Sequence, residues 1–415
     1  MESLVGQIST AHEHGPDIIR YRWLFAPWVL LFAPASMVQI KFGAHYFTLV
    51  DFWLPMFALL QLALVTIRPV NKFDRRYVTR YIVVFLIYIG VISYGFAYAA
   101  DKAGVFKELA KWLEILLISI GVILYVRNDR RFANLYWAMF FTLLGICIHH
   151  IFQNILRSDL FARMWVPVDW AVILSMPFLS VAWVQIIFLV ILVPSLVLSY
   201  SRLTWASSAL AFGVLGLFAK NTWLSVRRIR RIIISVFSIC GLVSVFVPGF
   251  IEIVVRRVMV TFNTKKDYSA FVREGMIKAS ILDFIHHPLL GIGAGNFKNH
   301  AITHQRNINF WISPEALPNS PHSVLLQTAA ELGVPGLIAF SLLLSIILVG
   351  IKRGRKVARC YAPMAPYSVG MALFTIPLFI TLIASNIGEL YRVIIGLYFG
   401  LAISMFRLYK VYTNR

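Results

Sequence analysis

The residues best suited to chemistry lie in the segment Asn319–Gly336, where polar side chains interrupt an otherwise apolar chain. His322 follows Pro321 and opens an apolar run, which is the pattern expected where a loop turns into a helix. Gln327 and Glu331 follow one helical turn apart and are therefore expected on one face of that helix. A histidine accepts a proton near neutral pH, so the segment is a candidate for general base catalysis.

Two arginines and a glycine-rich segment are further candidates. Arg202 lies just outside an apolar run, where arginine commonly anchors a helix at the membrane interface. Arg273 lies on a segment expected to be helical, and it would face either lipid headgroups or a bound anion. The segment His286–Phe297 contains Gly-Ile-Gly-Ala-Gly, and its glycines are expected to let the backbone approach a ligand closely.

The composition indicates the kind of fold that must position these residues. The chain has 415 residues, is 59% hydrophobic and only 14% charged. It contains many apolar runs of roughly 17 to 25 residues, the length that crosses a bilayer as a helix. We therefore expect an all-α integral membrane protein with a single polytopic domain, residues 1–415. The formal charge of +21 falls in short clusters between the apolar runs, so it indicates topology and not nucleic-acid binding.

Length and charge together predict a topology of about twelve transmembrane helices. Between 167 and 200 the crossings must be even in number, so a short or broken sixth helix and a seventh ending near Ser199 are expected. Basic clusters at Arg227 and Lys352 mark cytoplasmic loops, which places residues 251–331 outside as one large loop. The other spans are predicted at about 23–40, 46–67, 78–99, 109–126, 132–153, 204–224, 232–250, 334–351, 365–384 and 391–408.

The large loop is rich in histidine and in basic residues. It holds half of the chain's histidines, namely His286, His287, His300, His304 and His322. A helix is expected from Asp267 or Ser269 to about Phe284, lying at the membrane surface. One face of this helix is predicted to carry Val272, Met276, Ala279 and Asp283, and an adjacent face Arg273, Ile277 and Ser280.

The sequence does not favour a metal or a cofactor. The outer segments contain no D-x-D or H-E-x-x-H motif and no close pair of carboxylates, so arginines are expected to take the part of a metal ion. The Gly-Ile-Gly-Ala-Gly segment is similar to a dinucleotide fingerprint, but no strand is predicted before it, and we reject that interpretation. Cys147, Cys240 and Cys360 are scattered and indicate neither a metal site nor a disulfide framework.

At these residues the chain resembles the superfamily of O-antigen ligases and polymerases. The resemblance rests on Ser201-Arg202 after a span, Arg273 on a loop helix, H-P-L-L-G-I-G-A-G-N-F at 287–297 and H-S-x-L-L-Q-x-x-x-E-L-G-V-P-G at 322–336. It covers roughly residues 165–400. The spacing of Arg202, Arg273 and His322 is more similar to that in the ligases of Gram-negative bacteria. Family members more often have Asn where this chain has Ser323, and Pro321 precedes the histidine here.

The resemblance implies a GT-C-like glycosyltransferase of the bacterial inner membrane, with its active site facing the periplasm. It would transfer a glycan from undecaprenyl diphosphate to lipid A-core oligosaccharide, with inversion and without a metal, cofactor or nucleotide. His322 would activate the acceptor hydroxyl, and Arg202 and Arg273 would hold the diphosphate. Lower-ranked candidates for substrate binding are His287, Asn296, Asn319, Gln327, Glu331 and Glu389.

Three alternatives remain open at the level of the sequence. The nearest is an O-antigen or exopolysaccharide polymerase, which would use a second lipid-linked glycan as acceptor. A protein O-glycosyltransferase would load the same donors onto a protein. A polysaccharide transporter would also be apolar and basic, but it should show repeated halves, and the sequence has no evident internal repeat.

Overall fold

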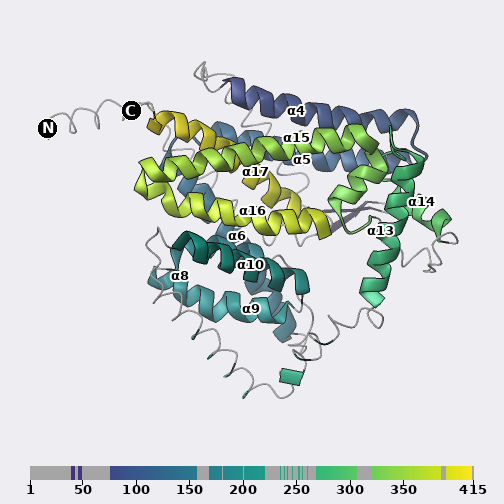
Figure 1. Ribbon diagram of the computed structural model, residues 1–415. Helices are drawn as coiled ribbons and strands as arrows, with labels where there is room; N and C mark the ends of the chain where they lie inside the picture. Colours follow the sequence, from purple (N-terminus) through teal and green to yellow (C-terminus); the bar gives the residue numbers. More distant parts are fainter. Residues whose placement is uncertain are drawn as a thin grey trace.

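Helices account for nearly all of the architecture that the computed structural model describes. The described residues are 39–42, 45–48, 75–156, 168–179, 181–199, 201–219, 268–305, 320–384 and 389–413, with a few helical residues between 234 and 259. The longer helices run side by side as a bundle (Figure 1). They are α4 (Arg75–Tyr94), α5 (Lys102–Tyr125), α6 (Asp129–Leu156), α10 (Arg202–Ala219), α15 (Val324–Cys360), α16 (Ala365–Ala384) and α17 (Glu389–Thr413).

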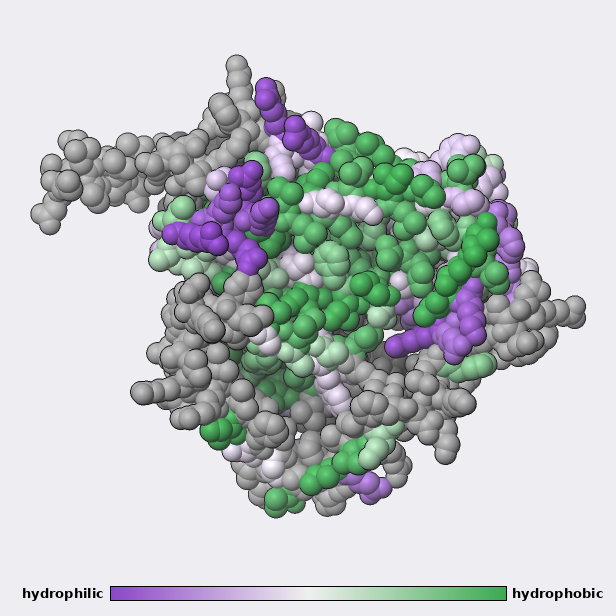
Figure 2. Space-filling model, viewed as in Figure 1, coloured by the Kyte–Doolittle hydropathy of each residue, from purple (hydrophilic) through white to green (hydrophobic). Residues whose placement is uncertain are grey.

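Five of the described helices are long and apolar enough to cross a membrane, namely α4, α6, α15, α16 and α17. Hydrophobic side chains cover the middle of the bundle and hydrophilic ones gather toward its ends (Figure 2). This distribution supports the prediction of an all-α, multi-pass membrane protein. The predicted spans at 23–40, 46–67 and 232–250 lie wholly or largely outside the described residues.

The segment between 167 and 200 forms one short helix and one longer one. The short helix is α7 (Val168–Ser175), which continues as a 3-10 turn to Phe178. The longer helix comprises α8 (Ala182–Ile187), a π-helical turn at Phe188–Leu192 and α9 (Val193–Leu198). The lengths and ends of these two helices agree with the prediction of a short helix followed by one that ends near Ser199.

A small β-hairpin differs from the predicted spans. Strands β1 (Gln39–Phe42) and β2 (His45–Thr48) pair antiparallel, with Phe42 opposite His45. Residues 46–48 had been predicted as the start of a helix, and this was wrong. The reason is local, since Ile40, Phe42, Tyr46, Phe47 and Thr48 are of the aromatic and β-branched types that favour strands.

Glycines and one ion pair hold the centre of the bundle together. A Cβ at Gly400 of α17 would lie 2.4 Å from the Val122 side chain of α5, and a Cβ at Gly350 of α15 would lie 2.3 Å from the Ala402 carbonyl. Small residues at such crossings let helices approach closely, which is the main source of packing energy in a membrane. Arg392 of α17 donates to Glu114 of α5 at 3.2 Å inside this packed region.

A smaller unit, α13 (Tyr268–His286) with α14 (Phe297–His304), stands across one end of the bundle (Figure 1). The helix predicted to end at about Phe284 is therefore confirmed. Of the residues predicted to share one face of it, Met276, Ala279 and Asp283 are fully buried. Ser280 on the adjacent face is also buried, whereas Ile277 is exposed. This unit has a small hydrophobic core of its own, separate from that of the bundle. It consists of Met276, Ala279, Ile292, Phe297, Ala301 and Ala330.

A break in α15 joins this unit to the bundle. Gly333 has φ 63° and ψ −155°, so the helix is kinked there. The carbonyl of Ala330 accepts from the N–H of Ile292 at 3.0 Å, and that of Glu331 from Gly293 at 2.9 Å. In return the N–H of Val334 donates to Pro288 at 2.8 Å. Pro335 has no N–H to offer Glu331, so the loop supplies the hydrogen bond that the helix lacks.

The tenth span was predicted at 334–351, and the part of α15 after the break at Gly333 begins there and continues to Cys360. The turns before the break, from Val324, are the helix that was expected to open after His322. The glycines of the loop were expected to approach a ligand. In the structure Gly291 instead packs against the backbone of Glu331, and Gly295 against that of Gly104 on α5.

We expect Gly291→Ala to unfold or strongly destabilise this joint. Gly291 has φ 68°, and an added Cβ would lie 2.3 Å from backbone atoms of Glu331. A positive φ costs a non-glycine residue roughly 1–2 kcal/mol, and overpacking adds about 1–3 kcal/mol. Gly90→Ala on α4 is the control, since a Cβ there meets nothing within 4 Å. Thermal unfolding in detergent should show a large drop in melting temperature for Gly291→Ala only. Equal melting temperatures for the two variants would contradict the tight packing of the loop against α15.

Candidate functional site

His322 occupies a strained turn directly before α15. It has φ 55° and is the sole non-glycine residue with positive φ among those that the structure describes. Ser323 is the N-cap of α15, and its hydroxyl accepts a hydrogen bond from the N–H of Leu326 at 3.2 Å. The predicted position of His322 at a loop-to-helix boundary is thus confirmed. Unusual backbone conformations of this kind are found preferentially at functional sites.

The electrostatic surroundings of His322 favour a neutral imidazole. The ring is half-buried, and this burial lowers its pKa below the ordinary histidine value. The positive charge of Arg273 on α13 lowers the pKa of His322 further. Both effects disfavour the imidazolium form, so the side chain is available at neutral pH as a proton acceptor. Arg273 and His322, which are 49 positions apart in the chain, therefore act on one another in the fold.

A pocket with polar side chains in its lining lies about one helical turn beyond His322 along α15. Gln327 donates from Nε2 to Oε2 of Glu331 at 3.1 Å, as their spacing predicted. Oε1 of Glu331 accepts from the N–H of Phe297, the first residue of α14, at 3.3 Å. The pocket is lined by Tyr88, Ile92, Glu108, Lys111, Trp112, Ala294, Val324, Gln327, Thr328, Glu331 and Leu332. Glu331 thus lines the pocket and also caps α14.

Two lining residues, Glu108 and Lys111 of α5, were missed by the sequence analysis. They form an ion pair with one another and share the pocket with Glu331. The sequence alone showed no carboxylate pair because Glu108 and Glu331 are far apart in the chain. A usable signal was present, however, since ionisable residues within an apolar helix commonly mark a functional site.

Asn296 and His287 lie in the loop that joins α13 to α14. Asn296 is fully buried. Its side-chain oxygen accepts from the N–H of Asp101 at 2.7 Å, and its amide nitrogen donates to the carbonyls of Asp101 and Ala294 at 3.2 and 3.0 Å. These contacts fasten the loop to the start of α5. His287 is exposed, and its ring centroid lies 6.1 Å from that of His300.

The structure does not place the remaining predicted site residues in full. Arg202 and Glu389 are the first residues of α10 and α17, but their side chains lie outside the described part of the chain. Asn319 lies outside the described residues altogether. The predicted residues whose side chains are placed near α15 and α13 are therefore His322, Arg273, Gln327 and Glu331.

Comparison with known proteins adds one finding. Residues 187–341 match the model of a protein family described as O-antigen ligase. This part of the chain runs from the end of α8 into α15 and contains Arg202, Arg273 and His322. A search of the curated proteins finds no match to the chain.

Proposed function

Since the chain belongs to the O-antigen ligase superfamily, we propose that it transfers a glycan from undecaprenyl diphosphate to lipid A-core oligosaccharide. The observation that carries the proposal is the match of residues 187–341 to the O-antigen ligase family. Within this region Arg273 is near enough to His322 to lower its pKa, and the proposed transfer needs both a diphosphate-binding side chain and a neutral base. The bacterial inner membrane would hold the protein, with the site on the periplasmic side.

In the proposed reaction, the acceptor hydroxyl oxygen attacks the anomeric carbon of the donor glycan from the face opposite the diphosphate. The hydroxyl proton passes to the imidazole of His322. The bond from the anomeric carbon to the diphosphate oxygen breaks, and its electron pair leaves with undecaprenyl diphosphate. The anomeric centre is thereby inverted.

The departing diphosphate gains negative charge, so fixed donors aimed at it lower the barrier. Arg273 and Arg202 are proposed to supply these donors, because a guanidinium group binds phosphate oxygens through two parallel hydrogen bonds. The donor is already activated, and no nucleotide, cofactor or metal ion takes part in the proposed transfer step.

The small pocket on α15 has room for a group about the size of a water molecule, and we propose that it receives one sugar hydroxyl group. Gln327 and Glu331 offer an amide and a carboxyl group there, and Glu108 and Lys111 add opposite charges. Such groups donate to and accept from hydroxyls. Trp112 adds an aromatic surface to the same pocket. His287 and Glu389 remain candidates for outer contacts with the glycan.

A reconstituted transfer assay tests the proposal and separates it from the polymerase alternative. We expect the purified protein in lipid nanodiscs to convert lipid-linked glycan and lipid A-core into glycan-bearing lipid A-core without added divalent cation or nucleotide. Gel separation and mass spectrometry identify the product. Longer carrier-linked chains without a lipid A-core product would indicate a polymerase instead. A strict requirement for added magnesium or manganese would contradict the role given to the arginines.

A further inference from the structure

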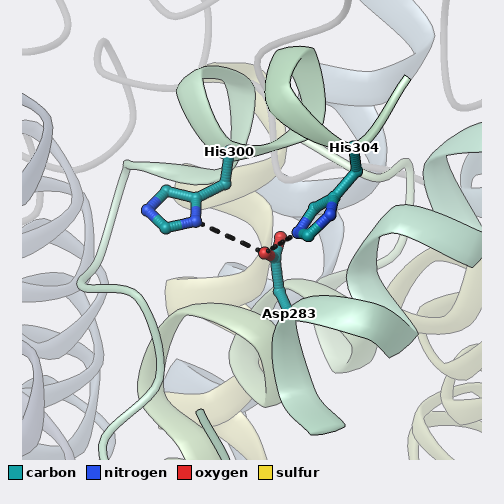
Figure 3. A group of neighbouring side chains, drawn as sticks. All are labelled: Asp283, His300 and His304. Carbon is teal, nitrogen blue, oxygen red and sulfur yellow. Dashed lines mark hydrogen bonds and ion pairs between the residues drawn. The ribbon is translucent and has the colours of Figure 1, made fainter. Parts of the chain in front are cut away.

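Three side chains between α13 and α14 form a cluster with no part in the proposed transfer step. Asp283 of α13 and His300 and His304 of α14 point toward one another (Figure 3). Oδ1 of Asp283 lies 2.8 Å from Nε2 of His304 and 3.4 Å from Nδ1 of His300. One ligand atom from each of the three lies within 4.8 Å of the others.

The cluster contains a buried polar atom that lacks a partner. The Asp283 side chain is completely buried. Its second oxygen, Oδ2, has no hydrogen-bond partner among the residues that the structure describes. Burying a carboxylate oxygen without a partner costs roughly 1–3 kcal/mol or more. A cation bound between Asp283 and the two histidines would offset the negative charge that is buried on this carboxylate.

We propose that Asp283, His300 and His304 form a binding site for a divalent transition-metal ion of the zinc type, with water as the fourth ligand. Two histidines one helical turn apart are a common zinc-binding arrangement. With zinc–ligand bonds of about 2.0–2.2 Å, tetrahedral ligand atoms lie about 3.3–3.5 Å apart. The pair of Asp283 and His300 already has this separation, and His304 needs to open by about half an ångström.

The three side chains differ in their exposure to solvent, and this difference shows from which side water can reach the cluster. The His304 side chain is 13% exposed, and that of His300 is 34% exposed. Water therefore reaches the site past His300, and this side provides the fourth ligand position. No metal site was expected from the sequence, because the outer segments lack the D-x-D and H-E-x-x-H motifs and a close pair of carboxylates. The spacing of His300 and His304 on one helix was the available signal.

The metal ion is assigned a structural role, that of fastening α14 to α13. The core between these helices is small and consists of six residues, four of which are Met276, Ala279, Phe297 and Ala301. Units with so little buried apolar surface commonly depend on a metal ion or another cross-link. Asp283 lies ten residues from Arg273, about 15 Å along α13, so the ion is remote from the diphosphate-binding group.

Metal binding by the full-length protein in nanodiscs tests the proposal. After treatment with a chelator, incubation with zinc chloride and desalting, the wild type is expected to retain one zinc ion per chain by elemental mass spectrometry. Zinc should raise its melting temperature, and cobalt should give the absorption of a tetrahedral site. Asp283→Asn should bind zinc at least about tenfold more weakly, since even residues that only support metal ligands contribute 10- to 100-fold.

Two further variants keep the test decisive. His300→Gln removes the most exposed ligand, so it should lose zinc without disturbing the fold even where Asp283→Asn misfolds. His286→Ala is the matched control, because its ring centroid lies 6.0 Å from that of His304 but it is outside the cluster. It should retain zinc as the wild type does. The proposal is overturned if the wild type holds no more zinc than His300→Gln, or if His286→Ala loses the ion equally. Both outcomes leave the transfer assay, and hence the proposed function, untouched.

Discussion

His322→Gln is expected to abolish glycan transfer while binding of the lipid-linked donor stays nearly unchanged. Glutamine keeps a hydrogen-bonding side chain at this position, but it cannot take up the acceptor proton at neutral pH. Loss of a general base typically costs 100- to 10,000-fold in rate. In the proposed reaction the donor is held by its lipid and by the arginines, so its affinity should depend little on His322. Transfer rates and donor binding of the variant, measured in the same nanodiscs, check both parts.

The pH dependence of the wild type provides a second readout of the same residue. Burial and the charge of Arg273 lower the pKa of His322 below the ordinary value of about 6.5. The base is therefore neutral at pH 7 and stays so on mild acidification. Transfer should decline only below pH 6.5, and the residual activity of His322→Gln should lack this decline. If His322→Gln kept substantial activity and its rate still declined below pH 6.5 as in the wild type, His322 would merely position the acceptor.

Arg273→Lys is expected to be nearly as damaging as Arg273→Ala, with transfer reduced about 100- to 1,000-fold. Lysine keeps the charge but loses the planar pair of donors that fits a diphosphate. The exposed Lys278 lies on the same helix and pairs with Glu274 at 2.7 Å, so Lys278→Ala is the matched control and should transfer normally. Initial rates at saturating acceptor compare the three variants.

The two Arg273 variants should differ in their pH profiles even though both are slow. Arg273→Ala removes the charge that lowers the pKa of His322, so the pH at which its transfer rate declines should rise toward the ordinary histidine pKa. Arg273→Lys retains a charge, so its rate should decline at a pH nearer to that of the wild type. Wild-type rates in Arg273→Lys would show that charge alone suffices, and the bidentate role would then be wrong.

The parts of the fold that depend on local sequence could be predicted well. The boundaries of α16 follow from a run of apolar residues, and α13 follows from its apolar spacing. His322 was placed correctly because the proline before it and the apolar run after it mark a helix start. These signals act over a few residues and need no knowledge of the tertiary fold.

Features that depend on contacts between remote segments could not be predicted. The pocket needs Glu108 of α5 beside Glu331 of α15, and no spacing rule relates two helices so far apart in the chain. The hydrogen bonds that Ile292 and Gly293 donate to the carbonyls of Ala330 and Glu331 could not be found by inspecting residues 324–336 alone. For the same reason the glycine loop was interpreted as a ligand cradle when its partner is a helix backbone.

The break at Gly333 has a mechanical consequence. The glycine loop bonds to α15 on both sides of this break, because Ile292 and Gly293 donate to the turns before Gly333 and Val334 after it donates to Pro288. Asn296 fastens the same loop to the start of α5. The loop therefore acts as a splint across the break, and the turn that carries His322 is held in a fixed position relative to the membrane bundle.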